Sequence, residues 1–215
     1  MSDAVEIVSF TLGPAQTNAY LLGDPASGLA VVIDPAWDGE HLLASASQRG
    51  WRVGQIWLTH AHFDHLGGAA ALADNAGQMV PVALHPADHP LWQVHGGGAL
   101  FGITEFDPGP EPTVDLADGM QLQLGPVTFQ VRHAPGHSPG HVMFHCQALG
   151  ALFCGDLIFA GSVGRVDLPG GNMEQLMASI RRHVLTLPDD TRLLPGHGPE
   201  TTVGRERASN PFLVG

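Results

Sequence analysis

The sequence predicts an α/β fold in which two β-sheets pack together with helices on the outside. Segments of strand character and helical character alternate along the chain as strands, helix, strands and helix, which is typical of layered α/β proteins. The chain has 215 residues and 44% hydrophobic content. That length and content suit one compact domain, residues 1–215, with a full core.

The first half reads as a meander of strands followed by strand and helix alternation. Turn residues separate the second and third strands, and Asp38 and Gly50 mark the start and the end of the first helix. The predicted strands are 5–12, 19–22, 29–33, 55–58 and 81–85, and the predicted helices are 38–48 and 68–76.

The second half contains four strands and the clearest amphipathic helix. Residues 95–113 are rich in Gly and Pro and predict a long loop, a feature that is often functional in a compact domain. The predicted strands are 120–124, 127–132, 141–146 and 151–154, and the helix is 173–187. A strand near Leu194 is then expected to lead into an irregular tail.

Composition excludes several classes of function. The net charge is −12 and all nine basic residues are arginines, so we expect no non-specific binding to nucleic acid. No apolar run approaches the length of a membrane span and no targeting segment is evident, which predicts a cytoplasmic protein that does not bind membranes. An anionic substrate remains possible, because bound divalent metals would make a pocket locally positive.

The two cysteines are expected to be buried thiols rather than a disulfide. Cys146 and Cys154 lie in short apolar runs joined by a turn, and a hairpin there would place Cys146 opposite Ala151.

The segment "THAHFDHLGG", residues 59–68, concentrates metal-type ligands directly after a predicted strand. At the carboxyl end of a strand, His60 and His62 can turn toward one metal ion, whereas Asp64 and His65 point toward a neighbouring site. The alternative is a helix N-terminus capped by Asp64 with histidines on the surface.

Three further strand ends carry ligand-type residues. His137 and His141 lie in "APGHSPGH", Asp156 follows "LFCG", and His197 follows "RLLPG". Each strand end alone is weak evidence for a metal site, since Asp156 could cap a helix and His197 could fill a turn. Together they supply what two ions bound by the first motif would lack.

This order of residues resembles the metallo-β-lactamase superfamily. The resemblance extends from "QTNAYLL" to "PGHGPETTVGRERASNPFL", and it implies a four-layer αββα sandwich of two mixed sheets flanked by helices. The segment "GSVGRVDLPGG" and the tail are similar to short, single-domain glyoxalase II-like hydrolases, also described as hydroxyacylglutathione hydrolase-like.

The resemblance also implies a dinuclear metal centre and a mechanism. Zinc is the first expectation for the two divalent ions, with iron or manganese as alternatives. A hydroxide shared by both ions would attack the carbonyl of a small-molecule thioester such as S-lactoylglutathione, with Asp64 and Asp156 also orienting it as catalytic residues. The implied first site is His60, His62 and His137, the second is Asp64, His65 and His197, and Asp156 bridges both.

The chain departs from two-domain glyoxalase II proteins, which carry a helical C-terminal extension with basic residues for glutathione. Here the chain has no Lys, and Arg165 is the remaining candidate for binding an anionic group. Its alternative role is an ion pair with Asp167. His141 is a candidate for contacting the substrate or supporting a metal ligand, or it fills a turn. Asn18 and Tyr20 match a family segment, and strand alternation favours a core position for Tyr20.

Other functions of the family remain as alternatives. The "GRVD" segment also resembles persulfide dioxygenases, in which His60, His137 and Asp156 would hold one iron. A catalytically inactive metal-binding protein would keep the same ligands. A β-lactamase is a weaker expectation, because those enzymes generally lack a bridging aspartate. Flavodiiron proteins and RNA-processing relatives are weaker expectations still. The sequence leaves the oligomeric state open.

Overall fold

The computed structural model describes residues 5–73 and 79–214. Contacts divide the chain into two compact units. Unit 1 contains residues 1–116 and 123–127, and unit 2 contains residues 117–122 and 128–215. Each unit supplies a set of the expected ligands.

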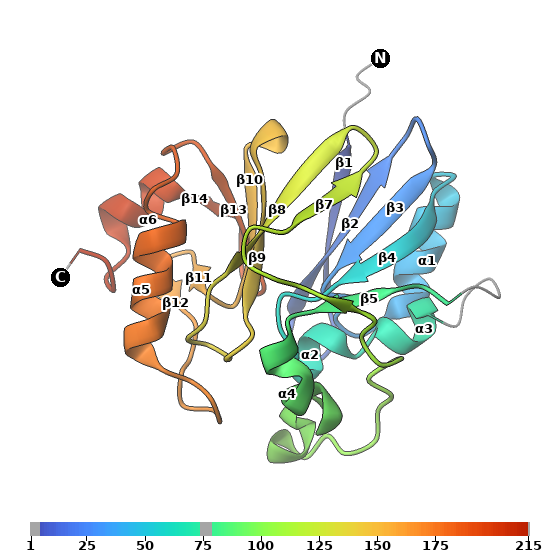
Figure 1. Ribbon diagram of the computed structural model, residues 1–215, viewed down its shortest axis with the longest axis horizontal. Helices are drawn as coiled ribbons and strands as arrows, with labels where there is room; N and C mark the ends of the chain where they lie inside the picture. The colour runs from blue at the N-terminus through green and yellow to red at the C-terminus, as the bar shows by residue number, and fades with distance from the viewer. Residues whose placement is uncertain (1–4, 74–78, 215) are drawn as a thin grey trace. The chain divides into compact units, whose positions relative to one another are not determined.

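Unit 1 is built on a mixed six-stranded sheet in the order β1-β2-β3-β4-β5-β6 (Figure 1). The first three strands form the predicted antiparallel meander, and β3 to β6 pair in parallel. The strands are β1 Glu6–Leu12, β2 Thr17–Asp24, β3 Leu29–Ile33, β4 Arg52–Trp57, β5 Val82–Leu84 and β6 Val114–Asp115.

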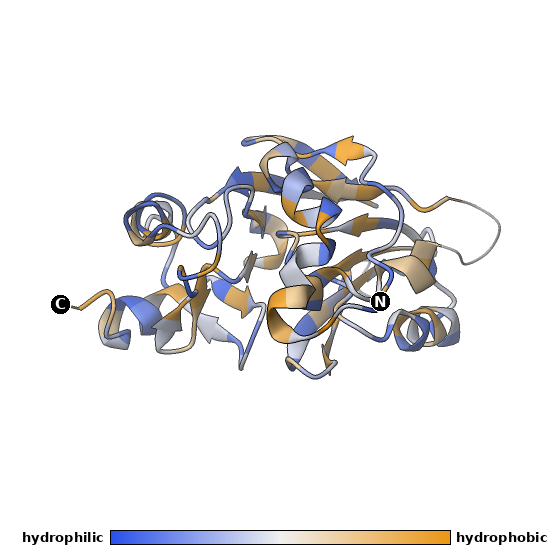
Figure 2. Cartoon of the chain, turned by 90° about the horizontal axis from the view of Figure 1, so that it is seen from below, coloured by the Kyte–Doolittle hydropathy of each residue, from blue (hydrophilic) through white to orange (hydrophobic). Residues whose placement is uncertain are grey.

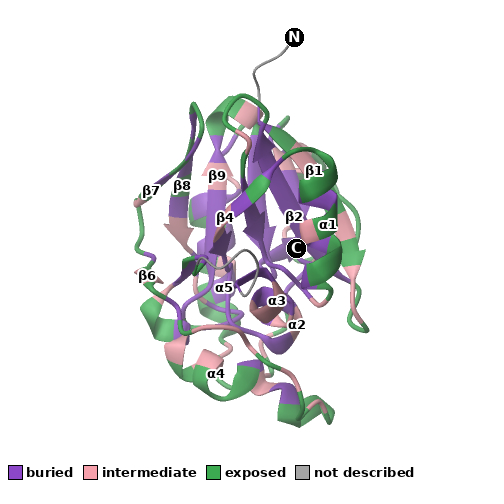
Figure 3. Ribbon diagram, turned by 90° about the vertical axis from the view of Figure 1, so that its right-hand side faces the viewer, coloured by how far each residue is buried: buried purple, intermediate pink, exposed green. Residues whose placement is uncertain are grey.

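Burial explains the strand pattern of unit 1. Every residue of β2 is buried, and β4 is buried at its carboxyl end, where the ligand motif begins (Figure 3). Strand β1 alternates exposed and half-buried residues, as an edge strand does. The central strands therefore hold the start of the motif rigidly.

The helices of unit 1 pack on the sheet through apolar side chains. The helix α1, Gly39–Gln48, buries Leu42 and Ala46 against Val32 and Ile56 of the sheet. The short helices are α2 Phe63–Leu66, α3 Ala69–Ala73 and α4 His89–Gln93, with 3-10 turns η1 at Pro86–Asp88 and η2 at His95–Phe101. Figure 2 shows the helices banded with hydrophobic and hydrophilic residues, as one-sided packing requires.

Unit 2 carries a second mixed six-stranded sheet in the order β14-β13-β10-β9-β8-β7. Its strands are β7 Gln121–Leu124, β8 Val127–His133, β9 Val142–Cys146, β10 Ala151–Gly155, β13 Arg192–Pro195 and β14 Thr201–Thr202. A separate hairpin joins β11 Ile158–Phe159 to β12 Ser162–Val163, and the 3-10 turn η3 spans Gln147–Leu149.

The helix α5, Met173–His183, packs Leu176 and Ile180 against Leu152 and Leu193 of the second sheet. It begins where the Asn172 side chain accepts a hydrogen bond from the backbone N–H of Gln175. It stops at His183, so the predicted end at 187 was wrong.

The tail expected to be irregular is ordered, because a polar network anchors it. A helix α6, Val203–Ser209, follows β14, and the buried carboxylate of Glu206 accepts hydrogen bonds from Gly161 N–H, Thr201 Oγ1 and Asn210 Nδ2. Apolar periodicity cannot reveal a helix held this way. The predicted loop 95–113 begins with η2, and the predicted end of the helix 68–76 lies outside the described residues.

Both thiols are buried and free, and β9 and β10 pair Cys146 with Ala151 as expected. Burial raises the pKa of Cys146 and Cys154, which keeps both thiols protonated and unreactive. Within the described part of the chain, every helix is too short or too polar to cross a membrane.

Candidate metal centre

Three buried histidines gather in unit 1 at the end of β4. The ligand atoms of His60 lie within 4.8 Å of those of His62 and of His65, and the His60 and His65 rings are 4.1 Å apart between centroids. His60 and His65 are fully buried, and His62 is 6% exposed. The alternative of surface histidines at a helix N-terminus is therefore wrong.

A buried carboxylate sets the tautomer of two of these rings. Asp34 Oδ2 accepts hydrogen bonds from His65 Nδ1 at 3.0 Å and from Thr59 Oγ1 at 2.7 Å. Because the Thr59 hydroxyl donates its hydrogen bond to Asp34, its oxygen accepts a hydrogen bond from His60 Nδ1 at 2.9 Å. Both rings then carry hydrogen on Nδ1 and present Nε2 as the nitrogen able to bind a metal ion.

Asp64 lies beside this group on α2. Its Oδ2 accepts a hydrogen bond from Thr17 Oγ1 at 2.9 Å and lies 3.7 Å from His65 Nε2. Asp64 and His65 are thus adjacent oxygen and nitrogen donors, as a second ion would require.

One close backbone approach and one hydrogen bond fix the motif. A Cβ on Gly68 would lie 2.6 Å from Pro35 O, so the chain passes only because glycine has no side chain. The backbone N–H of Ala61 donates to Asp88 Oδ2, whose side chain is fully buried. The loop between His60 and His62 is therefore held by a carboxylate from the turn after β5.

In unit 2, one carboxylate oxygen lies near two histidines. Asp156 Oδ2 is 3.6 Å from His137 Nε2 and 3.5 Å from His197 Nε2. His137 and Asp156 are buried, and the His197 side chain is 29% exposed. This arrangement suits a carboxylate shared between two ions.

Neighbouring groups orient this second set. His137 Nδ1 donates to Arg165 O at 2.8 Å, which again leaves Nε2 for metal. The backbone N–H of Asp156 donates to His141 Nε2 at 3.1 Å, so the fully buried His141 supports the turn that carries Asp156.

The side chain of Arg165 forms an ion pair. Its Nε and Nη2 each lie 2.7 Å from an oxygen of Asp167, and these bonds lower the pKa of Asp167 to about 2. Of the two roles weighed for Arg165, the structure contains the ion pair with Asp167.

The same construction underlies both sets. In unit 1, Asp34 and Thr59 follow the parallel strands β3 and β4, and Asp34 N–H donates to Trp57 O. In unit 2, Asp156 and His197 follow the parallel strands β10 and β13, whose register pairs Gly155 with Pro195. Each set therefore combines residues from the ends of adjacent strands.

Sequence reasoning missed Asp34, Thr59 and Asp88 as supporting residues. Asp34 carries the signal that identified Asp156, namely an acid directly after a buried apolar strand. Asp88 has no such signal, because it lies in a turn whose position only the fold reveals.

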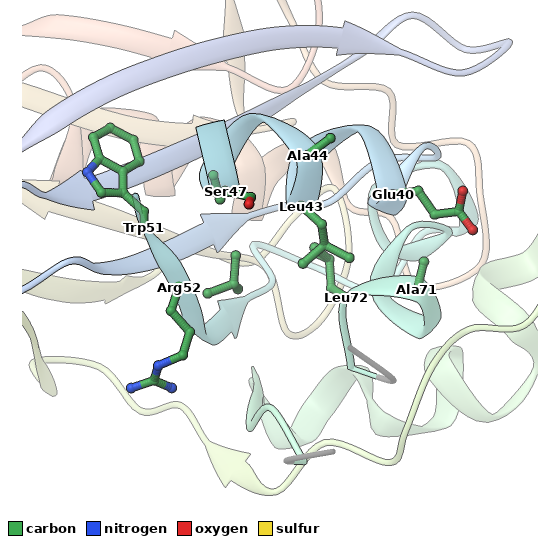
Figure 4. Close-up of a pocket in the computed structure, with 10 residues that line it drawn as sticks. Glu40, Leu43, Ala44, Ser47, Trp51, Arg52, Ala71 and Leu72 are labelled. Carbon is green, nitrogen blue, oxygen red and sulfur yellow. The ribbon is translucent and has the colours of Figure 1, made fainter. Parts of the chain in front are cut away.

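A cavity of about 690 Å³ lies elsewhere in unit 1, between α1, the start of β4 and α3 (Figure 4). Leu43, Ala44, Trp51 and Leu72 give it an apolar lining, with Glu40 and Arg52 also on its wall. It contains none of the candidate ligands.

Known proteins resemble this chain over nearly its full length. A probable metallo-hydrolase, YqgX of Bacillus subtilis, is 38% identical over 95% of this chain and 95% of its own length. The hydroxyacylglutathione hydrolase GloC of Haemophilus influenzae is 33% identical over 97% of both chains.

Solved structures agree with these relatives. The B3 metallo-β-lactamase BLEG-1 matches with a TM-score of 0.89 and 39% identity over 98% of this chain and 100% of its own. TTHA1623 in a di-iron-bound form matches at 0.86 and 46%, over 96% and 100%. ETHE1 from Myxococcus xanthus matches at 0.81 and 25%, over 97% and 84%. Residues 12–197 also match the family described as the metallo-beta-lactamase superfamily. The chain therefore belongs to the metallo-β-lactamase superfamily and has its fold, with two mixed sheets and helices.

Proposed function

We propose that this metallo-hydrolase is dinuclear and cleaves thioesters, with S-lactoylglutathione as the reference substrate. In this proposal the ligands of unit 1 and unit 2 come together to hold two divalent ions. His60, His62 and His137 hold the first, Asp64, His65 and His197 hold the second, and Asp156 bridges both. Zinc is the expected metal, with iron or manganese as alternatives.

The donor chemistry of the residues fits such ions. In His60, His65 and His137, Nδ1 hydrogen-bonds to an oxygen, so Nε2 remains as the donor nitrogen. Histidine nitrogens with carboxylate oxygens suit zinc, iron and manganese. The oxygens that hold Nδ1 also fix each ring before a metal arrives.

Two bound ions would supply a hydroxide near neutral pH and stabilise the developing charge on a thioester carbonyl. Asp64 and Asp156 would accept hydrogen bonds from the attacking water and orient it toward the carbonyl carbon. Of the proposed histidine ligands, all except His197 are buried. Attack by water breaks the C–S bond and yields a carboxylic acid and a thiol, without a covalent intermediate on the protein.

The observation that carries the proposal is the position of Asp156 Oδ2, within 3.6 Å of two histidine Nε2 atoms. One oxygen so placed can serve two neighbouring ions. The similarity to GloC supports the thioester as the bond that is cleaved.

A persulfide dioxygenase is the second candidate, and the similarity to ETHE1 favours it. In that case His60, His137 and Asp156 would hold a single iron. An inactive metal-binding protein is the non-enzymatic alternative.

The test is metal analysis of the purified protein together with assays on S-lactoylglutathione, simple thioesters, lactones and β-lactams. We expect two ions per chain, thioester hydrolysis without oxygen uptake, and loss of turnover in Asp64→Ala. The control Asp190→Ala removes an exposed carboxylate from a turn and should keep full activity.

Oxygen consumption with one iron per chain would establish the dioxygenase instead. A folded, metal-loaded protein that turns over none of these substrates, and that consumes no oxygen with glutathione persulfide, would contradict both enzymatic functions.

A further inference from the structure

We propose that Val94, Leu100 and Phe101 form an apolar rim beside the metal-binding motif, and that this rim binds an apolar group of the substrate. The substrate class is then a thioester with an apolar acyl or thiol arm rather than a glutathione ester, which carries two free carboxylates. This inference rests on the proposed thioester hydrolysis and narrows it.

The rim is joined directly to the motif within unit 1. A Cβ on Gly96 would overlap the backbone of Phe63, so the segment that carries the rim touches the motif at the residue after His62. The rings of Phe63 and Phe101 lie 5.2 Å apart between centroids. Figure 1 shows α4 next to α2, the helix that carries Asp64 and His65.

The three side chains are exposed although they are apolar. Val94 is 62%, Leu100 is 65% and Phe101 is 45% exposed. Single exposed apolar residues are ordinary, but three within eight positions next to metal ligands form a patch that a ligand can cover. Covering apolar surface is the main favourable contribution to binding an uncharged group.

The segment that carries the rim has a defined backbone. His95, Gly96, Gly97 and Gly102 have positive φ values between 51° and 75°. Gly97 N–H donates to Val94 O, Gly102 N–H to Ala99 O, and Ile103 N–H to Gly98 O. Since these turns already fix the chain, little conformational entropy is lost when a ligand binds.

The charge of unit 1 disfavours a substrate with free carboxylates. Between Arg52 and Arg132 the sequence contains neither Arg nor Lys, and Glu105 is the acid that follows the rim. A glutathione arm would therefore find no cation along this stretch. An alkyl or aryl arm does not require a cation.

The experiment compares wild-type protein with two series of thioesters. The first contains acetyl, butyryl and hexanoyl esters of N-acetylcysteamine, and the second contains acetyl esters of ethanethiol, butanethiol and hexanethiol. A fully covered methylene contributes about 0.8 kcal/mol, so kcat/KM should rise by up to about 4-fold per methylene in at least one series.

The variant Leu100→Ser combined with Phe101→Ser should flatten that rise, so that the hexanoyl and hexanethiol esters lose more of their kcat/KM than the shortest ester of each series. If the double variant does not fold, Leu100→Ser and Phe101→Ser are tested separately. A control combines Met79→Ser with Phe212→Ser, two exposed apolar residues outside the rim, and should keep the wild-type slope.

Three results would overturn the inference. Hydrolysis of the shortest esters with no chain-length dependence in either series would refute substrate binding by the rim but agree with the proposed function. Absence of hydrolysis of every thioester would refute both the proposed function and the role of the rim. Conversion of an oligomer to a monomer by the rim variant, with an unchanged slope, would identify the rim as a contact between copies of this chain.

Discussion

Replacing Asp34 with Asn tests whether a residue that touches no metal controls metal binding. The carboxylate accepts three hydrogen bonds, from Thr59 N–H, Thr59 Oγ1 and His65 Nδ1, at 2.7, 2.7 and 3.0 Å. An amide has one oxygen, so it cannot satisfy all three. The side chain is 2% exposed, and water cannot easily replace a lost bond.

Two orientations of the new amide are possible, and each has a cost. With its nitrogen toward Thr59 N–H, two donors face each other and stability falls by about 1.5–3 kcal/mol, the range for a lost bond to a charged group. With its nitrogen toward His65, the ring must move its proton to Nε2, which blocks the metal-binding atom. Loss of such a supporting partner weakens metal affinity by about 10–100-fold.

The assays are chemical unfolding of the metal-free protein and competition titration with a chromogenic chelator. We expect Asp34→Asn to lose stability, metal affinity or both by these amounts, whereas Asp190→Asn at an exposed turn should change neither. Wild-type values of both quantities in Asp34→Asn would refute the assignment of the His65 and His60 tautomers.

Three further predictions concern unit 2. Burial and the neighbouring Arg132 lower the pKa of His145 to about 4, so folding favours the neutral ring; stability should fall by about 1–2 kcal/mol as pH drops from about 6.5 toward 4, allowing for partial exposure. His145→Gln should remove that part of the slope in urea unfolding at each pH, and an unchanged slope would contradict it. Gly136→Ala would push a Cβ into the backbone of Leu176 at a φ of 140°; we expect about 2–4 kcal/mol of destabilisation, and a melting temperature equal to wild type would rule this out. Glu206→Gln should lower the free energy of unfolding by about 1.5–3 kcal/mol, because an amide cannot accept all the hydrogen bonds that the Glu206 carboxylate accepts. Thermal unfolding at the wild-type temperature would contradict this role of the network.

The sequence predicted much of the fold because strand alternation and the apolar face of α5 are local signals. The meander β1 to β3 and the hairpin that pairs Cys146 with Ala151 were both predicted correctly. The helix α6 was missed because Glu206 anchors it through polar bonds, one of them to the distant residue Gly161. The end of α5 was placed late because Leu187 continues the apolar periodicity in a turn rather than a helix.

The candidate ligands could be identified because each follows a strand, and strand ends are visible in a sequence. Their assembly into one centre remains a prediction. The partners that orient them are less visible, because Asp34 meets Thr59 and His65 only through the pairing of β3 with β4. Arg165 supports His137 through its backbone carbonyl, which any residue could provide, so this role has no signal in the sequence, and binding of an anionic group by its side chain stays a prediction.

The use of adjacent parallel strands has a consequence for how the chain can change length. The backbone ladder between β10 and β13, including the bond from Gly196 N–H to Gly155 O, sets the spacing of Asp156 and His197. The crossover from β10 to β13, which contains α5, does not set this spacing and serves only to bring the chain back to β13. Insertions at its exposed turns, such as the one at Asp190, should therefore be tolerated without altering the spacing of this donor pair, which makes the crossover a natural place to graft new segments.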